Sequence, residues 1–114
     1  MIQIYHNSRC GKSRNCLAHI ESSKKEYVVI NYLITPPSLE ELLSIIEKLN
    51  MNPIDLVRQK EKLWIENFKD QKLDNKQIIQ AMITNPTLIE RPIVIKDNKA
   101  IIGRDLEKLA AFIS

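Results

Sequence analysis

The chain has 114 residues, the size of one ordinary domain, and 44% of them are hydrophobic, so it can bury a core without disulfides or a structural metal. Its net charge of +3 is too small and too dispersed to indicate a nucleic-acid-binding protein. Two cysteines are too few for a secreted disulfide scaffold, the N-terminus lacks a signal-peptide pattern, and no apolar stretch is long enough for a membrane span. We expect a cytoplasmic protein, a single domain over residues 1–114, with neither nucleic acid nor membrane as its partner.

The first third of the chain predicts a strand, a helix and a second strand. Residues 2–5 form a short apolar strand, and a polar turn over residues 6–9 follows it. A helix then runs from Cys10-Gly11 to about Ser22, with Cys16, Leu17 and Ile20 on one face. Residues 27–33 are rich in β-branched and aromatic side chains and predict the second strand. Two parallel strands joined by a right-handed crossover follow from this order.

The middle of the chain predicts several helices, which we interpret as an insertion at about residues 38–86. Ser38 and Glu41 form a capping-box pattern at the start of the first helix. Its apolar residues recur at helical spacing: Leu39, Leu42, Leu43, Ile46 and Leu49. Asn52-Pro53 predicts a short helix to about Val57, and Asp74 predicts a cap for a helix over residues 75–84. Between these two helices the pattern is ambiguous, with Trp64 and Phe68 as expected core residues.

The last third predicts a β-hairpin and a final helix. Residues 93–95 and 100–102 are apolar strands on either side of the turn Asp97-Asn98. Asp105 then caps a helix with apolar residues at helical spacing. The whole order is β-α-β, helices, β-β-α. It predicts an α/β fold with a mixed four-stranded sheet and helices on both faces.

Cys10 lies where the first strand passes into the first helix. The first amides of a helix lack intrahelical partners and carry the positive end of the helix dipole, so they stabilise a thiolate. Arg9, Arg14 and His6 are expected to add positive potential, and Gly11 lets the backbone approach a bound group. A purely structural cysteine is less expected at a polar, glycine-flanked helix start. The sequence therefore predicts a nucleophilic thiolate at Cys10.

The string His6-Asn7-Ser8-Arg9-Cys10-Gly11-Lys12-Ser13-Arg14 resembles the motif His-Asn-x-x-Cys-Gly-x-Ser-Arg of the glutaredoxin-coupled arsenate reductase family. That family, called ArsC-like, belongs with the Spx proteins to the thioredoxin-fold superfamily. The resemblance continues in Tyr32-Leu33-x-Thr35-Pro36-Pro37, in Leu56-Val57-Arg58 and in Leu88-Ile89-x-Arg91-Pro92-Ile93-Val94. It implies a thioredoxin-like fold and arsenate reductase activity.

The resemblance also implies roles for individual residues. Cys10 attacks arsenate, glutathione displaces the adduct as a co-substrate, and glutaredoxin resolves the mixed disulfide, without a tightly bound cofactor. His6 matches the histidine that tunes the thiol, and Pro92 matches the cis-proline that faces it. The implied oxyanion-binding residues are Arg58, Arg91, Arg104, Gly11, Ser13 and Arg14.

Physical chemistry supports these arginine roles to different degrees. Arginine stays charged and binds tetrahedral oxyanions bidentately, and its charge screens the repulsion between a thiolate and an anion. Arg91 lies between apolar residues, where a charge without a function would be costly to bury. For Arg58 and Arg104, a solvated surface position is equally well supported by the sequence.

Ser13 stands where a dithiol oxidoreductase has its second cysteine, which predicts a monothiol mechanism that needs an external thiol. Cys16 is expected to pack in the core, and the separated histidines and cysteines give little support for a metal site. A phosphatase loop of the form Cys-x5-Arg is excluded, because Cys16 stands at the place of its arginine. Two alternatives stay open: a regulatory protein of the Spx type that binds RNA polymerase, and a glutathione-dependent reductase of another substrate.

Overall fold

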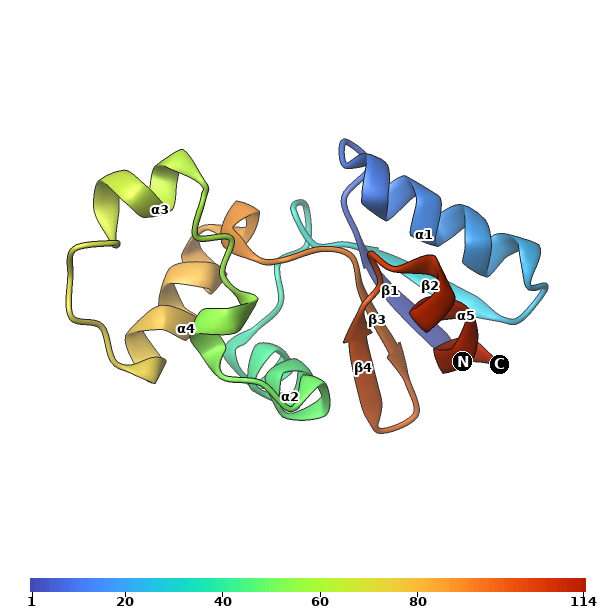
Figure 1. Ribbon diagram of the computed structural model, residues 1–114. Coiled ribbons are helices and arrows are strands. Elements are labelled where there is room, and N and C mark those ends of the chain that lie inside the picture. The colour runs from blue at the N-terminus through green and yellow to red at the C-terminus, as the bar shows by residue number, and fades with distance from the viewer. The chain divides into compact units, whose positions relative to one another are not determined.

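The computed structural model describes all residues from Met1 to Ser114, and the chain divides into two compact units (Figure 1). The first unit joins the two ends of the chain, Met1–Thr35 and Arg91–Ser114. The second unit is the continuous segment Pro36–Glu90. A single domain with a helical insertion at about residues 38–86 stays a prediction. None of the helices combines the length and the apolar character that crossing a membrane requires.

The first unit contains one four-stranded sheet. Its strands are β1 (Ile2–His6), β2 (Tyr27–Asn31), β3 (Ile93–Lys96) and β4 (Lys99–Ile102), in the order β2-β1-β3-β4. β1 runs parallel to β2 and antiparallel to β3, and β3 runs antiparallel to β4. The predicted mixed sheet, with its β-α-β beginning and its C-terminal hairpin, is confirmed.

β2 is shorter than the sequence indicated. It ends at Asn31, whereas the prediction extended to Leu33. The Asn31 carbonyl accepts the N–H groups of Ile34 and Thr35 at 3.1 and 2.9 Å. These two hydrogen bonds close a turn that ends the strand at Asn31. Tyr32 and Leu33 continue the strand-like residue pattern, but they lie in this turn.

One face of this sheet holds the core of the first unit. α1 (Gly11–Ser22) and α5 (Leu106–Ile113) pack on the same face, where Figure 1 shows them together. The residues that fill this core come from both strands and helices: Ile2, Ile4, Cys16, Ile20, Val94, Leu109 and Ile113. Cys16 is fully buried among them, as predicted. α1 therefore packs on β1 and β3 through Cys16 and Ile20, with its N-terminus next to the end of β1.

The second unit is helical. It contains α2 (Leu39–Leu49), α3 (Lys62–Asn67) and α4 (Asn75–Thr84), with short 3₁₀ turns η1 (Pro53–Leu56) and η2 (Pro86–Leu88). Two of the three predicted N-caps of this unit are confirmed: Ser38 forms a capping box with Glu41, and Asp74 forms one with Gln77. Each box satisfies backbone N–H groups that a helix start otherwise leaves without partners.

Two details of the helical prediction are wrong. The short helix expected over residues 53–57 is a 3₁₀ turn without a side-chain cap from Asn52, because Val57 is extended and forms a β-bridge with Ile89. On α2, Leu39 and Leu43 are 42% and 47% exposed. The buried face is centred on Leu42, Ile45 and Ile46, and the two exposed leucines lie on its flank.

The expected aromatic core residues lie in this second unit. Trp64 is buried on α3, as predicted, whereas Phe68 is only half-buried; the two rings stack with 5.3 Å between the centroids. Because α3 has only six residues, this stack supplies contacts that so short a helix cannot obtain from its own backbone.

Candidate active site

The loop between β1 and α1 places Cys10 at the N-cap of the helix. Asn7 accepts the N–H of Cys10 on its carbonyl at 3.0 Å and the N–H of Arg9 on its side-chain oxygen at 2.9 Å. The Cys10 carbonyl accepts the N–H of Arg14 at 3.0 Å, the first bond of the helix. Cys10 itself has an extended backbone and makes no side-chain capping bond. Its sulfur is therefore left at the helix start, as the sequence predicted.

Ser13 ties the end of β1 to the first turn of α1. Its hydroxyl is completely buried, accepts the N–H of Asn7 at 3.0 Å and lies 2.6 Å from Nδ1 of His6. Burial, and then the charge of Arg14, lower the pKa of His6 below its usual value, so its ring is neutral at neutral pH. The expectation that His6 adds positive potential is therefore wrong. Its contact through Ser13 connects it to the helix start that carries the thiol, and its tuning role stays a prediction.

The sulfur of Cys10 is surrounded by donors. Burial by itself raises the pKa of the thiol, but hydrogen bonds from the Ser13 N–H, the Arg91 side chain and the Lys12 N–H lower it. The positive charge of Arg91 acts in the same direction, and the pKa of Cys10 is lowered overall. Lys12 and Ser13 stand in the first turn of α1, where amide hydrogens have no partner inside the helix. The site thus stabilises a thiolate and offers donors to a second anion.

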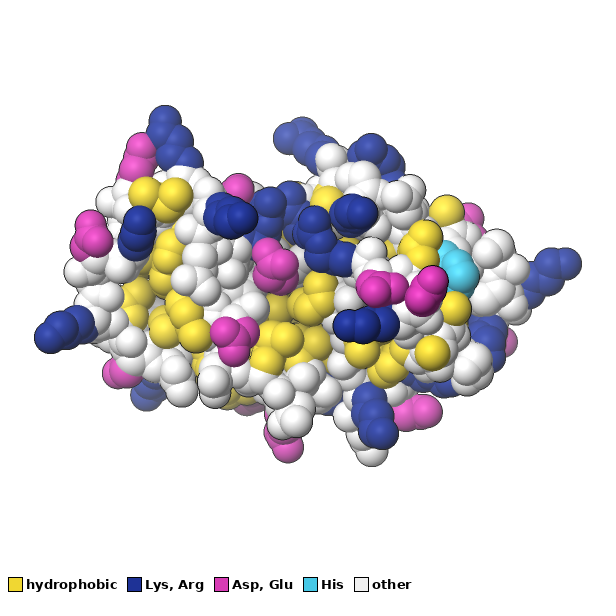
Figure 2. All heavy atoms as spheres, viewed as in Figure 1, with side chains coloured by type: hydrophobic (Ala, Val, Ile, Leu, Met, Phe, Trp, Pro, Cys, Tyr) yellow, Lys and Arg dark blue, Asp and Glu magenta, His cyan; other side chains and the backbone are white.

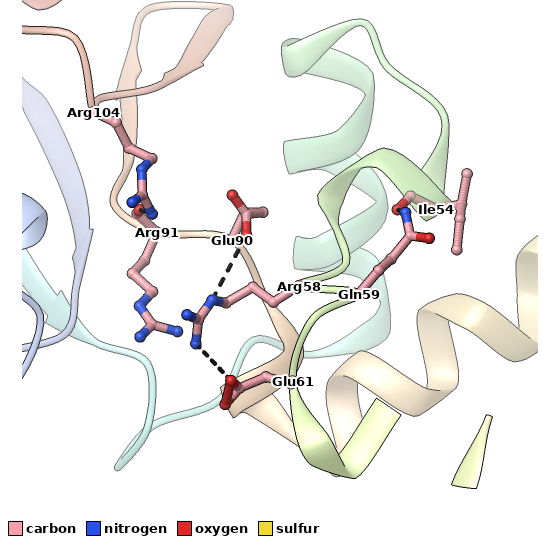
Figure 3. Close-up of polar contacts among 7 residues, drawn as sticks. All are labelled: Ile54, Arg58, Gln59, Glu61, Glu90, Arg91 and Arg104. Atoms are coloured by element: carbon pink, nitrogen blue, oxygen red, sulfur yellow. Dashed lines mark hydrogen bonds and ion pairs between the residues drawn. The ribbon is translucent and has the colours of Figure 1, made fainter. Parts of the chain in front are cut away.

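Arg91 approaches this thiolate from the segment that precedes β3. Its Nε is buried without a hydrogen-bond partner, and its peptide bond to the buried Pro92 is cis, as the family resemblance implies. Arg104 follows β4 and donates from Nη1 to the Arg91 carbonyl at 3.5 Å, and Figure 3 shows its guanidinium beside Arg91. The first unit therefore brings two of the three predicted arginines next to each other, and one of them to Cys10.

Arg14 and Gly11 complete the surroundings of the loop. Arg14 donates from Nη1 to the Ser8 carbonyl at 2.9 Å, which fixes its guanidinium over the loop. A Cβ atom on Gly11 would meet only Nη2 of Arg14, at 3.6 Å, so packing does not require glycine there. The chain has no Asp or Glu before Glu21, and Figure 2 shows Lys and Arg side chains gathered around this end of α1. The surface around the thiol is cationic, as an anion site needs.

Arg58 lies in the helical unit and is already paired. Its guanidinium forms ion pairs with Glu61 at 3.2 Å and with Glu90 at 3.7 Å (Figure 3). Its backbone N–H donates to the Leu88 carbonyl at 2.7 Å. The sequence did not indicate these carboxylate partners, because Glu90 is remote from Arg58 along the chain. An oxyanion at Arg58 would compete with both of them, and its predicted role stays a prediction.

Comparison with known proteins assigns the family. The model of the ArsC family matches residues 5–112. The chain belongs to the ArsC family. It is 44% identical over 110 residues to the Escherichia coli protein YfgD, covering 95% of this chain and 92% of that one. It is 40% identical over 112 residues to an arsenate reductase of Neisseria meningitidis serogroup A, covering 96% of each.

Solved structures agree with this assignment. A putative arsenate reductase from Yersinia pestis superposes with a TM-score of 0.91 at 42% identity, over 97% of this chain and 99% of that one. An arsenate reductase from Vibrio cholerae gives a TM-score of 0.90 at 40% identity, over 96% and 95%. These matches confirm the predicted family and its thioredoxin-like fold.

Two contributors to the site of this ArsC-family chain were missed by sequence reasoning. Asn7 was noted only as part of the motif, yet it organises the loop with its carbonyl, its side-chain oxygen and its N–H. Lys12 was given no role, and it acts through its backbone N–H. An asparagine directly after a strand and three residues before a helix cap is a recognisable turn signal for the first. No side-chain signal exists for the second, because any residue except proline supplies an amide.

Proposed function

We propose that this ArsC-family protein reduces arsenate to arsenite, with Cys10 as its only reacting thiol and with glutathione and glutaredoxin as its reductants. The observation that carries the proposal is the environment of the Cys10 sulfur, which two helix amides and Arg91 hold in a thiolate-favouring state. Relatives named arsenate reductases, at 40% identity over nearly the full length, support the same substrate. Arsenate is a tetrahedral anion, and the cationic end of α1 suits its charge.

In the first step the Cys10 thiolate attacks the arsenic atom of arsenate. A sulfur–arsenic bond forms, an arsenic–oxygen bond breaks, and that oxygen leaves as water after taking up protons. Arg91, together with the first-turn amides, screens the repulsion between the two anions and stabilises the charge on the arsenate oxygens. We assign the same role to Arg104 and Arg14, whereas Gly11 leaves space for the oxygens.

In the later steps an external thiol supplies the electrons. The glutathione thiolate attacks the Cys10 sulfur, the electron pair of the sulfur–arsenic bond stays on arsenic, and As(V) leaves as As(III) in arsenite. Glutaredoxin then attacks the glutathione sulfur of the mixed disulfide and releases the Cys10 thiolate. Ser13 and the buried Cys16 offer no resolving thiol, because the first is a hydroxyl and burial raises the pKa of the second to about 12. Such a cycle needs no bound cofactor and belongs in a reducing compartment, the cytoplasm.

The test is an arsenate reduction assay with glutathione and glutaredoxin present, and then with each omitted. We expect saturable arsenite formation that disappears without glutathione, and strongly slowed multiple turnover without glutaredoxin. Phosphate, which matches arsenate in shape and charge, should compete. Absence of arsenite formation in the complete mixture would refute the proposal. Retention of this protein on purified RNA polymerase in that case would favour the Spx-type role, and reduction of another substrate would favour the third hypothesis.

A further inference from the structure

Gly103 lies at a junction of three segments in the first unit. It directly follows β4, is buried, and donates its N–H to the Pro92 carbonyl at 2.8 Å. Its φ angle is not positive, so an L-amino acid could adopt its backbone conformation. The reason for glycine at this position must therefore be space rather than conformation.

The space around Gly103 has no room for a side chain. A Cβ atom there would lie 2.8 Å from Sγ of Cys16, 3.0 Å from Cγ2 of Val94 and 3.6 Å from Cγ of Pro92. Cys16 and Val94 are both fully buried, and neither is a long side chain with a flexible end that could swing away. Because protein cores are packed nearly as densely as crystals, the added carbon must displace the backbone of a neighbouring element.

Two neighbours of Gly103 belong to segments that carry groups of the candidate site. Cys16 stands on α1, whose first-turn amides of Lys12 and Ser13 donate to the Cys10 sulfur. Pro92 directly follows Arg91, which donates to the same sulfur. Gly103 itself precedes Arg104. A displacement at this junction therefore changes the distance between the amide donors and the arginine donors.

We propose that Gly103 is a positioning residue, which sets the spacing between α1 and the Arg91-Pro92 segment through its contact with Cys16. This inference rests on the proposed function for its consequences in catalysis. It also explains what the buried Cys16 contributes, because its sulfur forms the surface against which the Gly103 backbone packs. Gly103 does not touch substrate and acts through the groups that do, whereas Cys16 supplies only the surface against which Gly103 packs.

The first experiment is the Gly103→Ala variant, with Cys10 titrated through the ultraviolet absorbance of its thiolate. Because burial raises the pKa of Cys16 to about 12 and a phenol ionises at about pH 10, absorbance followed below about pH 8.5, with the tyrosinate band at longer wavelength subtracted, reports on Cys10. We expect the midpoint of Cys10 to rise by about one pH unit as Arg91 and the amides move apart. The KM for arsenate should rise about tenfold, and kcat at a pH where the thiol is ionised should change much less.

A size-compensating variant tests the contact itself. Cys16→Ala removes the sulfur nearest to the added Cβ, so the double variant Gly103→Ala/Cys16→Ala should recover most of the Cys10 midpoint and of the KM. Ile113→Ala is the matched control, because Ile113 belongs to the same core but lies at the end of α5, which carries no group of the site. It should lower the urea midpoint without moving the Cys10 titration.

The outcomes separate this inference from the proposed function. A folded Gly103→Ala protein with an unchanged Cys10 midpoint and KM would overturn the positioning role, as would a shift that Cys16→Ala does not reverse. If Gly103→Ala does not fold, Cys16→Val, which enlarges the same contact from α1, must raise the midpoint instead, and an unchanged midpoint there refutes the role. The titration needs no turnover. A wild-type protein inactive on arsenate would therefore defeat the proposed function and leave the positioning role to be decided by the titration.

Discussion

The two cysteines of this chain stand six residues apart, one at the start of α1 and one within it, and the fold treats them in opposite ways. Cys10 precedes the first turn of α1, where free amides and Arg91 lower the pKa of its thiol. Cys16 faces the core between α1 and the sheet, where burial raises the pKa of its thiol to about 12. The contrast shows that position along a helix, rather than residue type, decides which thiol the fold favours as a thiolate.

Removing the reactive member of the pair should have the largest effect. We expect Cys10→Ser to abolish arsenate reduction, with a loss of at least about a thousandfold, because a hydroxyl at neutral pH is a far weaker nucleophile than a thiolate. The fold should survive, since Cys10 makes no side-chain capping bond. Activity assays with circular dichroism on the same samples check both statements. Near-wild-type turnover by this variant would show that Cys10 is not the nucleophile of the pair.

The buried member of the pair should control alkaline stability. Cys16 ionises near pH 9.0 in the unfolded chain, and burial raises its pKa to about 12 in the folded one, so between these values only the unfolded chain releases the proton. Stability is fully present below about pH 9 and falls as pH rises towards 12. The shift of 3 units (12 − 9.0) corresponds to at most about 4 kcal/mol of unfolding free energy. Urea midpoints measured across this pH range give the slope.

Cys16→Ala is the control for that slope, because it leaves every other alkaline group in place. The variant should be less stable at neutral pH by about 1 kcal/mol through its small cavity, and it should lose less stability between about pH 9 and 12. If the unfolding free energies of wild type and variant fall in parallel over this range, the pKa of Cys16 is the same in the folded and the unfolded chain, which contradicts the prediction.

The donor that distinguishes the two thiols most clearly is Arg91. Arg91→Ala removes both a hydrogen bond and a positive charge from the Cys10 sulfur, so the thiol pKa should rise by about 1–2 units. A lowered pKa keeps the thiolate populated as pH falls. The acid limb of the activity profile should therefore move to higher pH in the variant by the same amount. Arg91→Lys keeps the charge and loses the planar fork, and its midpoint should fall between those of wild type and Arg91→Ala.

Measurement of the Cys10 titration midpoint and of the acid limb of the activity profile checks this prediction. An unchanged midpoint in Arg91→Ala would assign the lowered pKa to the helix amides alone. Arg91 would then contribute nothing to the difference in pKa between Cys10 and Cys16.

Much of this contrast was predictable from local sequence. Cys10 follows a strand and precedes a helix with a glycine, and Cys16 recurs with Ile20 on an apolar stripe, so the reactive and the buried thiol separate by pattern alone. The β-α-β beginning and the hairpin of the sheet followed from strand patterns and turn residues. These features depend on residues close together along the chain, and hydrophobic periodicity and turn residues are therefore enough to predict them.

The features that sequence reasoning missed depend on partners far along the chain. The carboxylate of Glu90 beside Arg58, and the crowding of Cys16 and Val94 around Gly103, are set by packing. The neutral state of His6 follows from its burial and from Arg14, which sequence adjacency to Cys10 does not reveal. On α2 the helical spacing is satisfied by the buried Leu42 and by the exposed Leu39 and Leu43 alike, so the spacing alone does not tell them apart.

The smallest predicted effect concerns catalysis by the Cys16 variant. Cys16→Ala should keep kcat/KM within about twofold of wild type, because its sulfur is fully buried and holds its proton at neutral pH. Cys16→Ser should behave alike per folded molecule, with a larger loss of stability, since its hydroxyl would be buried among apolar side chains. Turnover per mole of folded protein, together with the Cys10 midpoint, is the measurement. A large loss of turnover with an unchanged midpoint would make Cys16 a redox partner, and the two thiols would then have to be treated as one reactive pair.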